Sequence, residues 1–133
     1  MSKCILIVEN DQSIRQILCE IAEGIGYQAL SVDRAMEAWN VLQEQTISLI
    51  LLDIKMPQVH GHQFLRFIRG KGKVIPVIVV SGYLRRDVLD EIVAEDQVAA
   101  VLAKPFTVRR VAQEISKALE GSQTLESSPV LAS

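Results

Sequence analysis

The stretch Leu49-Ile50-Leu51-Leu52-Asp53-Ile54-Lys55-Met56-Pro57 decides the fold of this chain. Its first four residues form an apolar run that is typical of a strand buried on both faces of a sheet. The run stops at the carboxylate Asp53, and Pro57 and Gly61 then indicate a loop. An acid at the end of such a strand lies on the rim of the sheet, where a ligand can reach it.

Similar apolar runs on both sides of this stretch predict more strands. Together with the strand before Asp53, at residues 48–52, the expected strands cover residues 4–8, 28–32, 74–80 and 98–102. Segments with apolar residues at helical spacing follow each of them, over residues 11–24, 34–45, 63–70, 85–95 and 108–119. Strands that alternate with helices in this way predict an α/β fold, a doubly wound parallel sheet with helices on both faces.

The composition is that of one globular domain. The chain has 133 residues, of which 49% are hydrophobic, so it can bury a sizeable core. Its 14 Lys and Arg nearly balance its 16 Asp and Glu. That balance argues against a general nucleic-acid binder, because such proteins need an excess of cations to neutralise phosphates. Cys4 and Cys19 lie in apolar patterns and are interpreted as small buried residues, not as a disulfide.

Signals for export or membrane insertion are missing from the sequence. No apolar run approaches the roughly 20 residues that span a bilayer, and the N-terminus lacks the pattern of a signal peptide. We therefore expect a cytoplasmic protein with no membrane contact. From Gly121 onward the sequence turns polar and loses its periodicity, which predicts a domain over residues 1–120 and a flexible tail over residues 121–133.

Chemically versatile residues stand at the ends of the predicted strands. Glu9 and Asn10 follow the first strand, Asp53 the third, Ser81 the fourth and Lys104 the fifth. Because ligands of open α/β sheets bind outside the carboxyl ends of the strands, we expect these side chains to converge at one edge. A carboxylate can act as a nucleophile toward phosphorus. A cation such as Mg²⁺, an ammonium group and a hydroxyl can then offset the charge on the transferred oxygens.

Three motifs in this order make the chain similar to the receiver domains of two-component response regulators. They are Asp53 with Met56-Pro57 and Gly61, then Ser81-Gly82 after a Val-rich strand, and then Lys104-Pro105-Phe106. The likeness covers about residues 3–120 and includes the chemotaxis regulators. It implies a flavodoxin-like three-layer sandwich whose five parallel strands are in the order 2-1-3-4-5.

The resemblance also implies roles for individual residues. Asp53 would be the phosphoacceptor for a histidine kinase or phosphotransfer protein, and Ser81 and Lys104 would contact the phosphoryl group. Mg²⁺ would be required, with Glu9, Asn10, Asp53 and the backbone carbonyl of Lys55 as its protein ligands. The peptide bond between Lys104 and Pro105 would be cis.

Two positions depart from the pattern of the family. The family has a second acid directly after the first one, where this chain has Asn10, so we expect weaker Mg²⁺ binding. Asp11 follows at a position that caps the first helix, although a rearranged loop could offer it to the metal. Val101 stands where many members carry Tyr or Phe, a ring that turns inward on phosphorylation.

These observations favour a regulatory phosphoacceptor, not an enzyme with an external substrate, although it would catalyse its own phosphorylation and dephosphorylation. Output would pass through contacts with a downstream protein, and a homodimer is an open alternative. Asn10 and Val101 also suit a degenerate receiver that acts as an interaction module without phosphorylation. A flavin protein fits poorly, because Glu9-Asn10-Asp11 is no phosphate-binding loop, and a haloacid-type phosphatase would have an acid where Lys55 stands.

Overall fold

The protein is described by a computed structural model that covers residues 3–54, 61–82, 90–92, 94–95 and 97–127. Its centre is a five-stranded parallel sheet with strand order β2-β1-β3-β4-β5. The strands are β1 (Cys4–Val8), β2 (Gln28–Val32), β3 (Leu49–Leu52), β4 (Val77–Ser81) and β5 (Val98–Ala103). The helices are α1 (Gln12–Gly24), α2 (Ala35–Glu44), α3 (Gly61–Gly70) and α5 (Val108–Ser127). The predicted doubly wound fold and its strand order are therefore confirmed.

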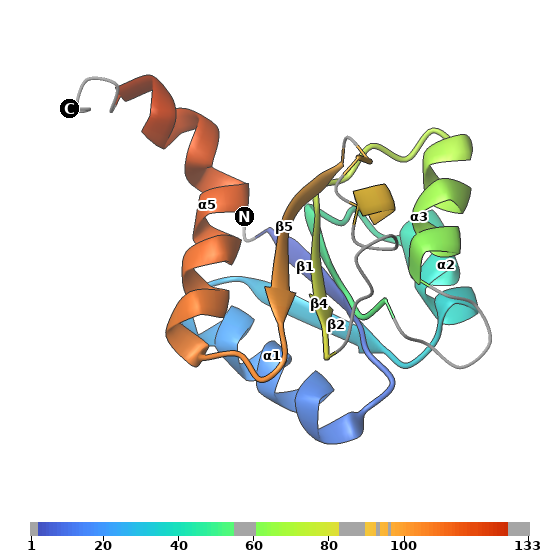
Figure 1. Cartoon of the computed structure of the whole chain (residues 1–133), viewed down its shortest axis with the longest axis horizontal. Helices are drawn as coiled ribbons and strands as arrows, with labels where there is room; N and C mark the ends of the chain where they lie inside the picture. Colours follow the sequence, from blue (N-terminus) through green and yellow to red (C-terminus); the bar gives the residue numbers. More distant parts are fainter. Residues whose placement is uncertain (1–2, 55–60, 83–89, 93, 96, 128–133) are drawn as a thin grey trace.

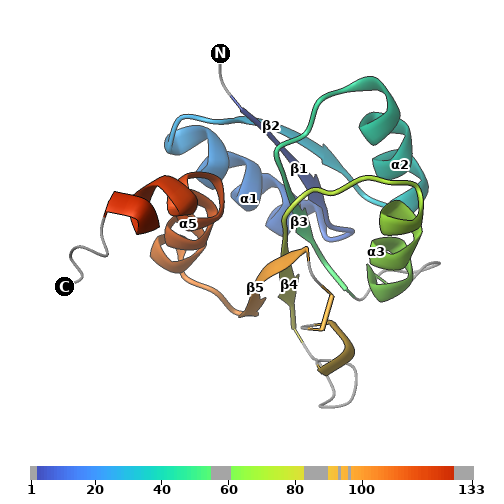
Figure 2. The same cartoon turned by 90° about the horizontal axis from the view of Figure 1, so that it is seen from above.

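Two helical layers cover the sheet (Figures 1 and 2), with α1 and α5 on one face and α2 and α3 on the other. Successive side chains along each strand point to opposite faces, which divides the core in two. Leu6, Val8 and Ile50 pack toward α2 and α3. Ile5 and Ile7 pack toward α1 and α5. In the part of the chain that the structure describes, none of the helices has the length and apolar character needed to cross a bilayer.

The three inner strands explain why their sequences are almost wholly apolar. Every residue of β3 and β4 is buried, and so is every residue of β1 after Cys4. Such strands have no solvent face, so their apolar residues run on without alternation. The edge strands β2 and β5 are mostly half-buried instead, which explains why β2 includes the exposed polar residues Gln28 and Ser31.

The first helix starts as its sequence predicts. Asp11 has extended backbone, and its carboxylate accepts a hydrogen bond from the N–H of Ile14, so it caps α1. At the other end, Gly26 has a φ of 99°, a conformation that costs glycine little and other residues more. The loop from Glu9 to Asp11 therefore lies between the carboxyl end of β1 and the start of α1.

The largest differences from the predicted boundaries lie at the fourth strand and the last helix. The fourth strand begins at Val77, three residues later than expected, because Pro76 has no N–H to donate and Val74 is 87% exposed. The last helix continues to Ser127 instead of ending at residue 119. Residues 121–127 include Gly121 and Thr124, which disfavour a helix, but no proline, the residue that would break it most strongly. Of the predicted helix 85–95, residues 90–92 are helical, and 83–89 lie outside the described residues.

Helix α3 is tied to the segment before β5 by an ion pair. Glu95 is 8% exposed, and its carboxylate lies 2.7 Å from the guanidinium of Arg69 and 3.6 Å from that of Arg66. Phe67 of α3 also packs against Trp39 of α2 in a T-shaped pair of rings, with a centroid separation of 5.0 Å. These contacts hold the helix that follows Asp53 in a defined position on the sheet.

Candidate functional site

The sheet register brings Glu9 and Asp53 together at its carboxyl edge. Val8 of β1 pairs with Leu52 of β3, so the next residues of the two strands are neighbours. The N–H of Asp53 donates to the carbonyl of Val8 at 2.9 Å, which continues the ladder one step past β3. Both acids are buried, with 1% of Glu9 and 4% of Asp53 exposed.

Ser81 and Lys104 join this edge from the other side. Ser81 is the last residue of β4 and pairs with Ala103 of β5. The N–H of Lys104 donates to the carbonyl of Ser81 at 2.8 Å. Ser81 is 2% exposed. The strand ends thus gather an acid pair, a hydroxyl and an ammonium group, as the sequence predicted.

Lys104 is the electrostatic centre of the site. Its Nζ lies 3.0 Å from Oε1 of Glu9 and 3.6 Å from Oδ2 of Asp53. The same Nζ donates a hydrogen bond to Oε2 of Glu9 at 3.3 Å. The lysine side chain is 18% exposed. One cation, on the residue that follows β5, thus contacts two buried carboxylates and lies nearer to Glu9 than to Asp53.

The Glu9 carboxylate is held on several sides. Its Oε2 also accepts a hydrogen bond from the N–H of Asp11 at 3.1 Å. Its Oε1, although at ion-pair distance from Lys104, accepts no hydrogen bond from the described residues. Burial raises the pKa of the Glu9 carboxyl, and the charge of Asp53 adds to that rise, whereas the hydrogen bonds from Lys104 and Asp11 oppose it.

Arg15 is a residue that the sequence reasoning missed. Its guanidinium Nη1 donates to the backbone carbonyl of Glu9 at 2.8 Å, which ties the loop after β1 to α1. The signal in the sequence was a basic residue one turn into a predicted helix that starts right after a candidate site. A basic side chain there can reach back to a carbonyl at the strand end.

The two residues after Glu9 have different surroundings. Asp11 caps α1 through its side chain, so the cap interpretation is confirmed over the rearranged loop. Asn10 is exposed beside the site. Lys55, whose backbone carbonyl was predicted as a metal ligand, lies outside the described residues, as do Met56 and Pro57.

The loop ends around Lys104 are closely packed. The peptide bond from Lys104 to Pro105 is cis, as the family resemblance implied. A Cβ placed on Gly82 would lie 3.8 Å from Cβ and Cδ of Lys104, so the backbone after Ser81 runs alongside the lysine stem. Val101 is half-buried and packs against the part of the core beneath α2 and α3. Position 101 thus holds an aliphatic side chain that is part of the core packing.

The donor set suits a hard cation. Glu9 and Asp53 supply carboxylate oxygens, which are ligands that Mg²⁺ accepts. Oε1 of Glu9 is a buried oxygen that accepts no hydrogen bond from the described residues, so it could take a further ligand. Within the described ranges, no three His, Cys, Asp or Glu residues form a cluster that could hold a metal. The two carboxylates of Glu9 and Asp53 suit Mg²⁺. An acid at position 10 would add a third.

Comparison with known proteins identifies the family. A family model described as "Response regulator receiver domain" matches residues 5–116. This chain belongs to that family. The response regulator protein FleR of Pseudomonas aeruginosa is 33% identical over 117 residues, which are 88% of this chain and 24% of FleR. The receiver protein CpdR of Brucella abortus is 32% identical over 117 residues, covering 88% of this chain and 97% of CpdR.

Solved structures of receiver domains share the fold. A CheY-like receiver domain protein from Methanospirillum hungatei superimposes with a TM-score of 0.85 and 25% identity. The match covers 92% of this chain and 98% of that one. The receiver chain thus resembles CpdR and this structure over nearly their whole lengths, whereas it matches only a part of FleR.

The buried Glu9 carboxyl predicts a pH-dependent stability. Because its pKa is raised in the folded protein, the folded state binds more protons than the unfolded state at pH values above about 4.5. The free energy of unfolding should therefore fall as the pH rises from that value to the raised pKa. Glu9→Gln cannot titrate, so its urea unfolding, measured in EDTA from pH 4 to 8, should lack this fall. Parallel curves for the two proteins would contradict the assignment.

Proposed function

We propose that Asp53 accepts a phosphoryl group from the phosphohistidine of a histidine kinase or phosphotransfer protein. The observation that carries the proposal is the position of Lys104, whose Nζ contacts both buried carboxylates at the strand ends. A lysine that already pairs with two carboxylates at the sheet edge can pair with the oxygens of a phosphoryl group instead. Membership of the receiver family supports the same assignment, and the comparisons give no support to a phosphorylation-independent module.

The transfer needs one nucleophile and a charged pocket. An oxygen of Asp53 attacks phosphorus, the bond between phosphorus and the histidine nitrogen breaks, and its electron pair stays on the imidazole. Lys104 offsets the charge on the phosphoryl oxygens, and the hydroxyl of Ser81 donates a hydrogen bond to one of them. The later hydrolysis of the aspartyl phosphate would return the carboxylate, so the protein is a regulatory phosphoacceptor.

Glu9, Asp53, Asn10 and the backbone carbonyl of Lys55 would hold Mg²⁺ at this edge. When bound, the ion would supply positive charge against the phosphoryl oxygens. Glu9 and Asp53 bring two negative charges and Lys104 one positive charge, and the neutral Asn10 adds none. Because the resulting site has a net charge of only −1, we expect a lower affinity for Mg²⁺ than an acid at position 10 would give.

The phosphoryl group would change the contacts of Lys104. It adds roughly −1.5 to −2 charge and new acceptor oxygens next to the Nζ. The lysine would shift from Glu9 toward the phosphoryl group, and the backbone link from Lys104 to Ser81 would carry the change into β4 and β5. The surface formed by β4, β5 and the helices after them would then present an altered face to a downstream protein in the cytoplasm.

Direct phosphorylation tests the proposal. Incubation with acetyl phosphate and Mg²⁺ should add a single phosphoryl group of about 80 Da to the intact protein, read by mass spectrometry. Asp53→Asn keeps the shape of the side chain but cannot form the acyl phosphate, so its mass should not change. Asp33→Asn, which removes an acid that follows β2, serves as the matched control and should still gain the group. An unmodified wild-type protein, or an adduct on Asp53→Asn, would overturn the proposal.

The Asn10→Asp variant tests the metal site separately. It restores an acid beside Glu9 and Asp53, so Mg²⁺ should bind about ten-fold more tightly or better. Isothermal titration calorimetry with Mg²⁺ alone measures this affinity without any phosphorylation. An unchanged affinity would show that residue 10 does not face the metal, while leaving the phosphoacceptor assignment intact.

A further inference from the structure

The strand β2 is an open edge of the sheet with no protection in its sequence. It is the outermost strand beside β1. Its sequence, Gln28-Ala29-Leu30-Ser31-Val32, has no charged residue and no proline. Soluble proteins commonly block their edges with lysine, proline or a bulge, because an open edge pairs with other strands. An unblocked edge of five residues is therefore suited to pairing.

The hydrogen bonds to β1 show which backbone groups of β2 face outward. The N–H of Gln28 donates to the carbonyl of Lys3 at 2.9 Å, and the carbonyl of Val32 accepts from the N–H of Glu9 at 3.1 Å. Backbone groups alternate in direction along a parallel strand. The N–H and C=O of Ala29 and Ser31 therefore point away from β1, two residues apart with Leu30 between them.

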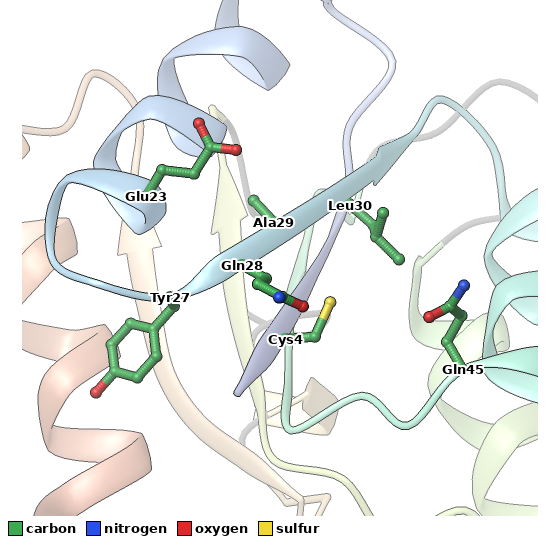
Figure 3. Close-up of a pocket in the computed structure, with 7 residues that line it drawn as sticks. All are labelled: Cys4, Glu23, Tyr27, Gln28, Ala29, Leu30 and Gln45. Carbon is green, nitrogen blue, oxygen red and sulfur yellow. The ribbon is translucent and has the colours of Figure 1, made fainter. Parts of the chain in front are cut away.

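A hollow of about 360 Å³ lies beside this edge. Residues of β2 and of the segments on both sides of it line this hollow. They are Cys4, Glu23, Tyr27, Gln28, Ala29, Leu30 and Gln45. Figure 3 shows Leu30 pointing from β2 toward Gln45, on the same side of the strand as Cys4. The residues on that side are largely apolar or uncharged, so the hollow can accept an apolar side chain.

We propose that β2 pairs antiparallel with β2 of a second copy of this chain, about a two-fold axis at Leu30. In this register Ala29 of each copy lies opposite Ser31 of the other, and each such pair exchanges two backbone hydrogen bonds. All four outward groups of each strand are then satisfied. Leu30 meets Leu30 of the second copy across the axis as a non-hydrogen-bonded pair, where side chains approach most closely, and both side chains cover the hollow.

Charge at the end of β2 is balanced within the chain, because the guanidinium of Arg34 lies 3.2 Å from the carboxylate of Asp33. This end of the strand therefore presents no excess charge to a second copy. The interface is independent of the phosphorylation proposal, because β1 separates β2 from the strand that carries Asp53.

Disulfide trapping tests the register. In a protein whose Cys4 and Cys19 are both replaced by alanine, Leu30→Cys places two thiols on the axis, within the reach of a disulfide. Gln28→Cys is the matched control, because residue 28 lies opposite residue 32 and far from its own counterpart. Under mild oxidation, Leu30→Cys should form at least about ten times more covalent dimer than Gln28→Cys. Equal yields from the two variants would overturn the proposed register.

A backbone substitution tests the pairing itself. Ser31→Pro removes an outward N–H without touching the bonds to β1, whereas Ser31→Ala keeps that N–H. Sedimentation velocity at high protein concentration should show weak dimerisation for the wild type and Ser31→Ala, and its loss in Ser31→Pro. Circular dichroism confirms that each variant is folded. A wild type that stays monomeric, or a Ser31→Pro variant that still dimerises, would contradict the proposal.

Discussion

The contact of Lys104 with two buried carboxylates is the interaction on which the rest of this site depends. Glu9 and Asp53 are both almost fully buried, and a buried charge is costly unless a partner offsets it. The Nζ of Lys104 provides that partner for both acids at once. The fold makes this possible, because β1, β3 and β5 all end at the same edge of one parallel sheet. The same arrangement leaves the lysine able to exchange one anionic partner for another.

The sequence was most informative where burial is most complete. The inner strands could be predicted because their residues are apolar on both faces, and a single charged residue at the end of such a run stands out, as Asp53 does. Element boundaries were predicted less well. β4 starts only at Val77, after Pro76, and α5 continues past residue 119 although its sequence turns polar. The preference of Lys104 for Glu9 and the ion pair of Glu95 with Arg69 join side chains far apart in sequence. The link from Arg15 is local, but it ends on the backbone carbonyl of Glu9, which no residue pattern marks.

The two departures from the family act on different parts of the proposed switch. Asn10 lowers the negative charge of the site and bears on metal binding, whereas Val101 removes an aromatic ring from the route by which a change could spread. With an aliphatic residue at position 101, a signal would have to pass through the backbone link between Lys104 and Ser81. The segment after β4 leads to Glu95, which is bound to Arg66 and Arg69 of α3. That ion pair joins α3, which follows Asp53, to the segment that follows Ser81. A movement of one of these two segments would therefore displace the other.

Chemical capture of the phosphorylated residue tests the central claim most directly. Borohydride reduces an aspartyl phosphate to homoserine with loss of phosphate, which leaves a permanent mark on the residue that carried it. After treatment with acetyl phosphate, Mg²⁺ and then borohydride, peptide sequencing by mass spectrometry should find homoserine at position 53 and at no other aspartate. Homoserine at Asp11 or Asp33, or none at any position, would contradict the account in which Lys104 and Glu9 prepare Asp53 for phosphorylation.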